Sequence, residues 1–142
     1  MKRLYTADKA NRTLPYVRGI VREMAERYKK LQELSRCHNA IPRDDAKARA
    51  SLKEEIRRES SELHDCQEEL LGIGVVLKDY ETGLVDFPAE LNGRPILLCW
   101  KLGEESVGHW HETDTGFAGR RPIPAGAPSW PGGVTAAPAA PE

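Results

Sequence analysis

The chain has 142 residues, of which 39% are hydrophobic and 30% are charged, and its net charge is −1. This length suits one domain with a core of its own, and the high charged fraction suits long solvated helices. The near-neutral total gives the molecule no strong attraction to nucleic acid or an anionic membrane, so we do not expect nucleic acid or a membrane as a partner. No stretch approaches the roughly 18 apolar residues that a membrane span needs.

The two halves of the chain differ in charge. Residues 1–60 carry 16 Lys and Arg against 9 Asp and Glu, whereas residues 61–142 carry 5 against 13. Such halves could pair within one molecule or across a dimer, or the basic half could be a solvated helix face. The first residues lack the apolar run of a secretory signal, and three widely spaced cysteines without a CxxC motif argue against a disulfide framework. We therefore expect a cytoplasmic protein.

The first half predicts two helices. Thr6 suits the N-cap of a short helical turn, and Pro15 suits the first position of a longer helix. After a break at 39–42, Asp44 and Asp45 suit the start of the second helix, because negative charge favours that end. Apolar positions step by four and three along each helix, which is the pattern of an antiparallel helical hairpin over residues 6–72. The seam residues are Val17, Val21, Met24, Tyr28, Leu31 and Ser35, then Leu52, Ile56, Glu59, Leu63, Cys66, Leu70 and Ile73.

Glu59 falls in the middle of the second seam, where an unpaired carboxylate would be costly. It could face a basic residue of the first helix, lie exposed at the seam edge, or bind a metal in a bundle core. A lone glutamate without a Glu-x-x-His partner is a weak metal signal.

After Gly74 the apolar residues recur at every second position, which is the spacing of a strand, and turn residues divide this part of the chain into short segments. We expect strands at 75–80, 84–87, 95–101 and 107–111, with Pro88 ending the second strand and Asn92-Gly93 forming a tight turn. This order predicts a four-stranded antiparallel meander over 75–112. From residue 124 onward Pro, Gly and Ala dominate, which predicts a disordered tail over 124–142.

Strand parity gathers a candidate site on one face of this sheet. A five-residue loop pairs Cys99 with His109 and places Leu98, Trp100 and Trp110 on the face that the helices cover. The opposite face then carries Cys99, His109 and His111, and the first hairpin adds Asp86 by pairing Leu77 with it. Imidazole, thiolate and carboxylate are ligands of zinc or a similar divalent transition metal. There are three alternatives to a metal site. The face could be an ordinary half-exposed polar surface, Asp86 could bond backbone amides, or Cys99 could be a nucleophile activated by His109.

The segment 113–123 contains glycines and two arginines and closes the domain. Asp114 could hold Arg120 or Arg121 through paired hydrogen bonds and tie the segment over the sheet. The arginines could instead form an anion site for a carboxylate or phosphate.

Three stretches together resemble a known family. They are TADKANRTLPYVRGIV (6–21), LGIGVVLKDYETGLVDFPAELNGRPILLCWKLGE (71–104) and GHWHETDTGFAGRRPI (108–123). The combination is similar to the bacterial family catalogued as domain of unknown function 2203, over residues 5 to about 123. The resemblance implies a short bacterial cytosolic protein with helices before a sheet. Trp110-His111 matches its pattern, which favours His111, Asp86 and Cys99 over His109 as ligands.

We expect an α+β fold: one domain over 1–123 in which the helical hairpin packs on the meander. The seams and the charge asymmetry favour a non-enzymatic interaction module that forms a homodimer through the hairpin or binds another protein. The alternative function is a metal-binding protein or small metalloenzyme centred on the polar face of the last hairpin.

Overall fold

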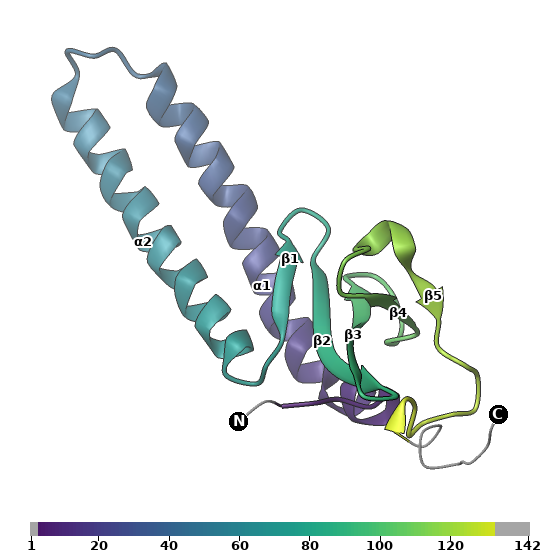
Figure 1. Cartoon of the computed structure of the whole chain (residues 1–142). Coiled ribbons are helices and arrows are strands. Elements are labelled where there is room, and N and C mark those ends of the chain that lie inside the picture. The colour runs from purple at the N-terminus through teal and green to yellow at the C-terminus, as the bar shows by residue number, and fades with distance from the viewer. Residues whose placement is uncertain (1–2, 133–142) are drawn as a thin grey trace.

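The computed structural model describes residues 3–132 and has the expected α+β architecture. Two antiparallel helices precede a sheet of five antiparallel strands in the order β1-β2-β3-β4-β5 (Figure 1). Their bounds are α1 (Ala7–Ala40), α2 (Ala46–Leu71), β1 (Val76–Asp79), β2 (Leu84–Leu91), β3 (Arg94–Lys101), β4 (His109–Glu112) and β5 (Arg121–Pro122), with a 3-10 turn η1 (Phe117–Gly119) before β5. No helix within residues 3–132 has the length and apolar character to cross a membrane.

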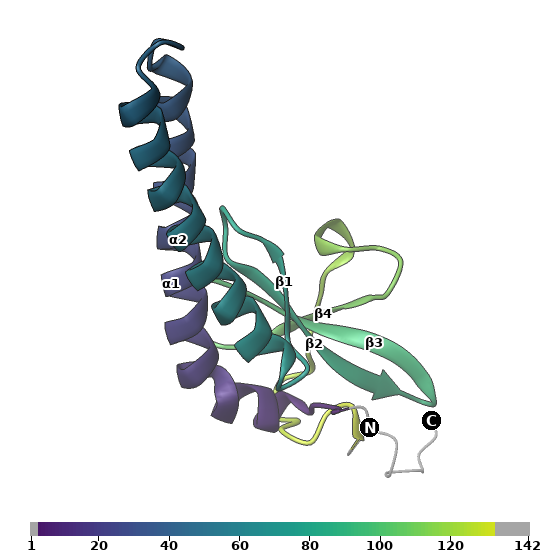
Figure 2. The same cartoon turned by 90° about the vertical axis from the view of Figure 1, so that its left-hand side faces the viewer.

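Helix α1 is continuous through Pro15, so the expected break before that residue is wrong. Thr6 is the N-cap as expected, and its hydroxyl accepts a hydrogen bond from the Lys9 N–H at 3.2 Å. Proline cannot donate to the carbonyl four residues earlier and pushes its ring against it, which bends a helix rather than always ending it. Figure 2 shows the first turns of α1 lying at an angle to the rest. Their burial of Ala7, Ala10 and Leu14 offsets the local cost of the proline.

The helical hairpin packs on the sheet by its base and projects beyond it (Figure 2). Burial in α1 ends at Met24, and burial in α2 begins at Leu63. Asp45 caps α2 as expected, since its carboxylate accepts from the Ala48 N–H at 3.2 Å. The projecting half therefore has a seam of partly buried residues only.

Glu59 is paired across the hairpin. Its carboxylate lies 3.0 Å from Arg27 Nη1 and 3.4 Å from Lys30 Nζ, and its side chain is 15% exposed. Of the three alternatives for Glu59, the structure shows the pairing with basic residues of the first helix.

The sheet has one strand more than expected, because the two-residue strand β5 pairs with β4. Two residues are too few to show an alternating pattern in the sequence. The Asn92-Gly93 turn is confirmed, with φ of 53° and 84°, which is the left-handed region that a two-residue hairpin turn requires. The expected end of the second strand at Pro88 is wrong, since β2 continues to Leu91.

The position of Pro88 explains why the strand continues. Its carbonyl accepts from the Tyr5 N–H at 2.8 Å, so this edge of the residue points away from β3. In a strand, the backbone N and the carbonyl of one residue point to the same side, so the N of Pro88 also points away from β3. The strand on that side, β1, pairs with β2 only as far as Asp86 and does not reach Pro88. The missing N–H of Pro88 therefore removes no ladder hydrogen bond.

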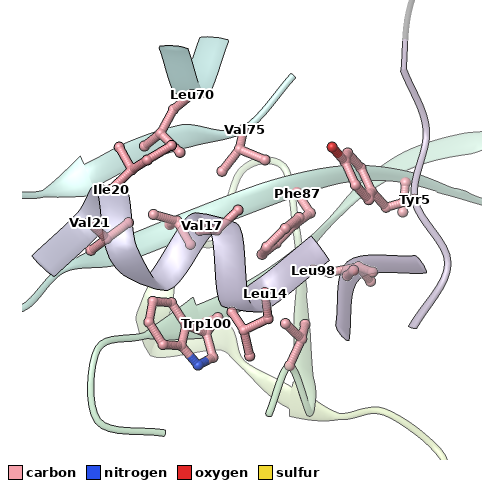
Figure 3. Packing of buried hydrophobic residues seen from close by; sticks show 14 of the residues in the cluster. Tyr5, Leu14, Val17, Ile20, Val21, Leu70, Val75, Phe87, Leu98 and Trp100 are labelled. Carbon is pink, nitrogen blue, oxygen red and sulfur yellow. The ribbon is translucent and has the colours of Figure 1, made fainter. Parts of the chain in front are cut away.

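The core lies between α1 and one face of the sheet. Figure 3 shows Leu14, Val17 and Val21 of α1 directed at Phe87 of β2 and at Trp100 of β3. All five are at most 2% exposed. The expected core face of the sheet, with Val85, Phe87, Leu98, Trp100 and Trp110, is confirmed.

The first β-hairpin contains a bulge that changes the expected register. Asp79 pairs with Leu84 as expected, but Leu77 pairs with Val85 and Val76 pairs with Asp86. Lys78 is the extra residue between Leu77 and Asp79. Leu77 consequently packs against the core and does not share a face with Asp86.

Residues 124–132 lie against the folded domain, so the expected disordered tail does not begin at 124. Trp130 is 4% exposed and its ring centroid lies 5.4 Å from that of Trp110. The carbonyls of Trp130 and Pro128 accept from the N–H groups of Ala7 and Asp8, each at 2.7 Å. These bonds satisfy donors that the start of a helix leaves free. Residues 133–142 of the expected tail lie outside the described residues.

Candidate functional site

Three metal-ligand side chains meet on the face of the sheet turned away from the helices. Asp86 of β2 and Cys99 of β3 are direct cross-strand partners, and His111 of β4 pairs with Leu97. One donor atom from each residue lies within 4.8 Å of the other two. Asp86 and His111 are 3% exposed and Cys99 is fully buried. The predicted register of the last hairpin, with Cys99 opposite His109 and Leu97 opposite His111, is confirmed.

Both ring nitrogens of His111 face acceptors. Nδ1 lies 2.7 Å from the Glu112 carbonyl and Nε2 lies 3.0 Å from Asp86 Oδ1. A neutral imidazole has only one N–H, so two such contacts require an imidazolium, a protonated Asp86 or a cation between Nε2 and the carboxylate. The carbonyl contact places the Nδ1 proton, and Nε2 is then the atom directed at the cluster.

Cys99 is held as a thiol by its surroundings. Burial is the main cause that raises the pKa of Cys99 to about 12, the negative charge of Asp86 adds to it, and Arg120 opposes it. A thiol with this pKa is a poor nucleophile near neutral pH, which disfavours the Cys99–His109 pair. A metal ion could still bind the sulfur by displacing its proton.

His109 is placed apart from the other three. It is half-buried and pairs with Cys99 across the ladder, but its ring does not join the group formed by Asp86, Cys99 and His111. Cross-strand pairing sets which residues share a face, whereas the lean of each ring decides which donor atoms meet. His111 is the histidine of the cluster.

The segment after β4 is tied to the sheet by Arg120, with a different partner from the expected Asp114. Arg120 Nη1 and Nη2 bind the two Glu104 carboxylate oxygens at 2.9 and 2.8 Å. Arg120 also lies 4.7 Å over the Phe117 ring, while Arg121 lies 5.1 Å over the Trp110 ring. Asp114 is exposed. The arginines are therefore engaged by a carboxylate and by aromatic rings.

Residues 113–120 lie beside the cluster, because Thr113, Gly116 and Phe117 line a hollow together with Asp86 and His111, and we call this segment the lid. The lid stands on the side of the sheet opposite the helices (Figure 2). Between the lid and the sheet is a hollow of about 200 Å³, lined by Lys78, Leu84, Asp86, Leu97, His111, Thr113, Gly116 and Phe117. Two of the three cluster residues, Asp86 and His111, line this hollow.

Sequence reasoning missed Glu104, Phe117 and Lys78. Glu104 accepts from the Lys101 N–H at 2.9 Å, in a turn where Gly103 has a φ of 104°. That glycine was a local signal for a tight turn after β3. The hydrogen bonds between Glu104 and Arg120 join residues 16 positions apart, and no periodic pattern in the sequence predicts such a pair.

The three side chains of the cluster could hold a zinc ion after small shifts. Zinc bonds of about 2.0–2.3 Å in tetrahedral geometry hold the donor atoms about 3.3–3.7 Å apart. The donor atoms here lie within 4.8 Å of one another, so shifts of about 1 Å would complete the geometry. An imidazole that donates its second N–H to a carbonyl is the usual form of a metal-bound histidine. Three protein ligands leave a fourth position open.

The chain belongs to the family described as uncharacterized conserved protein (DUF2203), whose model matches residues 3–123. No curated protein and no solved structure matches the chain significantly. The matched range includes the cluster and the lid, and it ends before the segment that carries Trp130.

Proposed function

We propose that this DUF2203 protein binds a divalent transition metal, with zinc as the best fit, through Asp86, Cys99 and His111. The observation that carries the proposal is the convergence of three different ligand types, all buried, two of which line a hollow. Buried charges are costly unless they are paired or coordinate a metal. A purely structural His111–Asp86 ion pair would need neither a thiol beside it nor a route from outside.

Each residue has a distinct part in this proposal. His111 presents Nε2, and its Nδ1–H bond to the Glu112 carbonyl keeps the ring from turning. Asp86 supplies a carboxylate oxygen, and Cys99 supplies sulfur once its proton is displaced. A metal bound by three protein ligands can polarise a carbonyl or activate water at its fourth position. Thr113, Gly116 and Phe117 of the lid line the hollow beside the cluster and would limit the access of water to such a metal.

β4 carries two histidines, of which His111 belongs to the cluster and His109 does not, so His109 provides a matched control for the test. The untagged full chain is purified without chelator, and its zinc, iron and manganese contents are measured beside those of His111→Ala and His109→Ala. We expect close to one equivalent of metal in the parent protein and in His109→Ala, and a loss of metal in His111→Ala. Cys99→Ser serves as a second ligand variant if His111→Ala fails to fold, as judged by circular dichroism.

Thermal unfolding with and without added zinc gives an independent measurement. A ligand that binds only the folded state raises the unfolding midpoint, and zinc at 100 times its Kd stabilises by about 2.7 kcal/mol. A well-folded parent protein that neither retains zinc nor gains stability from it would contradict the proposal and leave the cluster as a buried ion pair.

Self-association through the helical hairpin is a second candidate function. The observation in its favour is the projecting half of the hairpin, where residues 25–62 include no fully buried side chain. A two-helix seam gains stability when a second copy or a partner covers it. Sedimentation equilibrium at low and high salt tests this candidate: we expect a dimer that weakens with salt, and a monomer at every concentration would contradict self-association.

A further inference from the structure

The hollow beside the cluster is lined by both charged and apolar side chains. Asp86 and His111 of the cluster line it, and so does the cation Lys78. Leu84, Leu97 and Phe117 are large apolar residues of its wall. A small space with apolar walls and a few convergent polar groups is the usual form of a small-molecule site.

Lys78 reaches this hollow because of the bulge in β1. Lys78 and Asp79 together oppose Leu84, and the two residues of a bulge re-aim the side chains next to them. Leu84 and Asp86 share the face of the sheet that carries the cluster, and Lys78 lines the same hollow with them. Bulges recur next to functional sites for this reason.

Lys78 has no ion pair among residues 3–132. The cations next to the hollow have other contacts: Arg120 is paired with Glu104 at 2.8 Å, and Lys101 lies 5.4 Å over the Phe117 ring. Among the described residues that line the hollow, Lys78 is therefore the basic side chain that remains available to a ligand.

The charges around the open metal position favour a monoanion. A divalent ion bound by a thiolate, a carboxylate and a neutral imidazole is balanced by its own ligands. The ammonium of Lys78 then gives the hollow a surplus of one positive charge. A carboxylate carries one negative charge and binds both metals and ammonium groups, whereas a phosphate dianion would exceed the surplus.

We propose that the hollow between the lid and the sheet binds a small monocarboxylate, whose carboxylate group lies between the metal and Lys78 and whose short apolar body lies against Leu84, Leu97 and Phe117. This inference rests on the proposed metal function. A hollow of about 200 Å³ holds about six water-sized groups, which limits the body to a few carbon atoms.

The test uses the full chain loaded with Co²⁺, whose visible absorption reports its ligands. Acetate, butyrate and inorganic phosphate are titrated into the parent protein, Lys78→Met, Lys78→Arg and Lys101→Met, and cobalt content is measured first for each. We expect butyrate to change the spectrum at lower concentration than acetate or phosphate. Lys78→Met should bind butyrate at least tenfold more weakly at unchanged cobalt content, while Lys78→Arg and Lys101→Met stay within a few fold of the parent.

The outcomes separate the two proposals. A protein that binds no cobalt overturns the metal function and with it the carboxylate site. A protein that binds cobalt but shows no spectral response to carboxylates, or binds phosphate more tightly than butyrate, keeps the metal function and overturns this inference. Equal butyrate affinity in Lys78→Met and the parent overturns the role of Lys78.

Discussion

The pair formed by Glu104 and Arg120 joins the lid to the sheet through two parallel hydrogen bonds. The Arg120 side chain is 11% exposed and that of Glu104 is 23% exposed, so the pair is largely shielded from water. Burial acts to raise the pKa of Glu104, but hydrogen bonds from Arg120 and from the Lys101 N–H outweigh it, and the pKa lies below its ordinary value. A carboxyl with a lowered pKa stabilises the folded state above the pKa of the unfolded chain.

Glu104→Gln should lower the free energy of unfolding by about 2 kcal/mol at pH 7, because Arg120 loses the charge of its partner. The stabilisation is fully present above the unfolded-state pKa of about 4.3 and is lost as the pH falls through the lower folded-state value. Urea unfolding from pH 7 to pH 3 should therefore show the gap between parent and variant closing only below about pH 4.3. Glu105→Gln, at an exposed neighbour, is the control, and a gap that does not change with pH would contradict the assignment.

The amide side chain of Asn11 joins α1 to the loop before β4. The Val107 N–H donates to Asn11 Oδ1 at 2.7 Å, and Asn11 Nδ2 donates to the Val107 carbonyl at 3.2 Å and to the Ala7 carbonyl at 2.9 Å. The Asn11 amide thus pairs with Val107 as a strand backbone would. Val107 is 3% exposed, so water cannot replace these bonds at little cost.

Asn11→Ala should lower the free energy of unfolding by about 2 kcal/mol, because it leaves buried backbone groups of Val107 without partners. Asn11→Asp keeps the acceptor for the Val107 N–H and should cost less. Asn39→Ala, on the exposed end of the same helix, should change stability by no more than about 0.5 kcal/mol. Equal stability of Asn11→Ala and Asn39→Ala in urea unfolding would show that the amide pairing contributes nothing.

At the scale of the whole molecule, the two ends of the described chain meet. Residues 124–132 bring Trp130 onto Trp110 and place two carbonyls at the start of α1. The same contact connects the sheet, the first helix and the C-terminal segment. A sequence rich in Pro, Gly and Ala can order itself in this way because Trp130, together with the fully buried Pro131, supplies the buried area.

Trp130→Ala should lower the free energy of unfolding by about 3 kcal/mol through loss of the buried ring, and should weaken the near-ultraviolet circular dichroism that the Trp110–Trp130 contact produces. Thermal and urea unfolding measure the first effect. Ser129→Ala, at an exposed neighbour, should leave both properties unchanged. A parent-like unfolding midpoint in Trp130→Ala would mean that the segment does not stabilise the domain.

The candidate cluster was largely predictable because strand alternation is a local property. The loop length before β4 and the turn residues set which side chains of β3 and β4 share a face, and the tryptophans selected the face that is buried. Asp86 was placed correctly beside Cys99 even though the bulge at Lys78 changed its partner in β1. His109 and His111 could not be separated by parity, because both lie on the same face of one strand.

Local patterns in the sequence predict the caps of the two helices, the turn at Asn92-Gly93, the core face of the sheet, and a group of Asp86, Cys99, His109 and His111 on the opposite face. These follow from periodicity and turn chemistry over a few residues. The folded structure was needed to show that His109 lies outside the cluster, that α1 continues through Pro15, that Arg120 binds Glu104, that Lys78 lines a hollow and that Trp130 is buried. Each of these depends on contacts between segments far apart in the chain, whose gain outweighs the local preference for a break, a different partner or disorder.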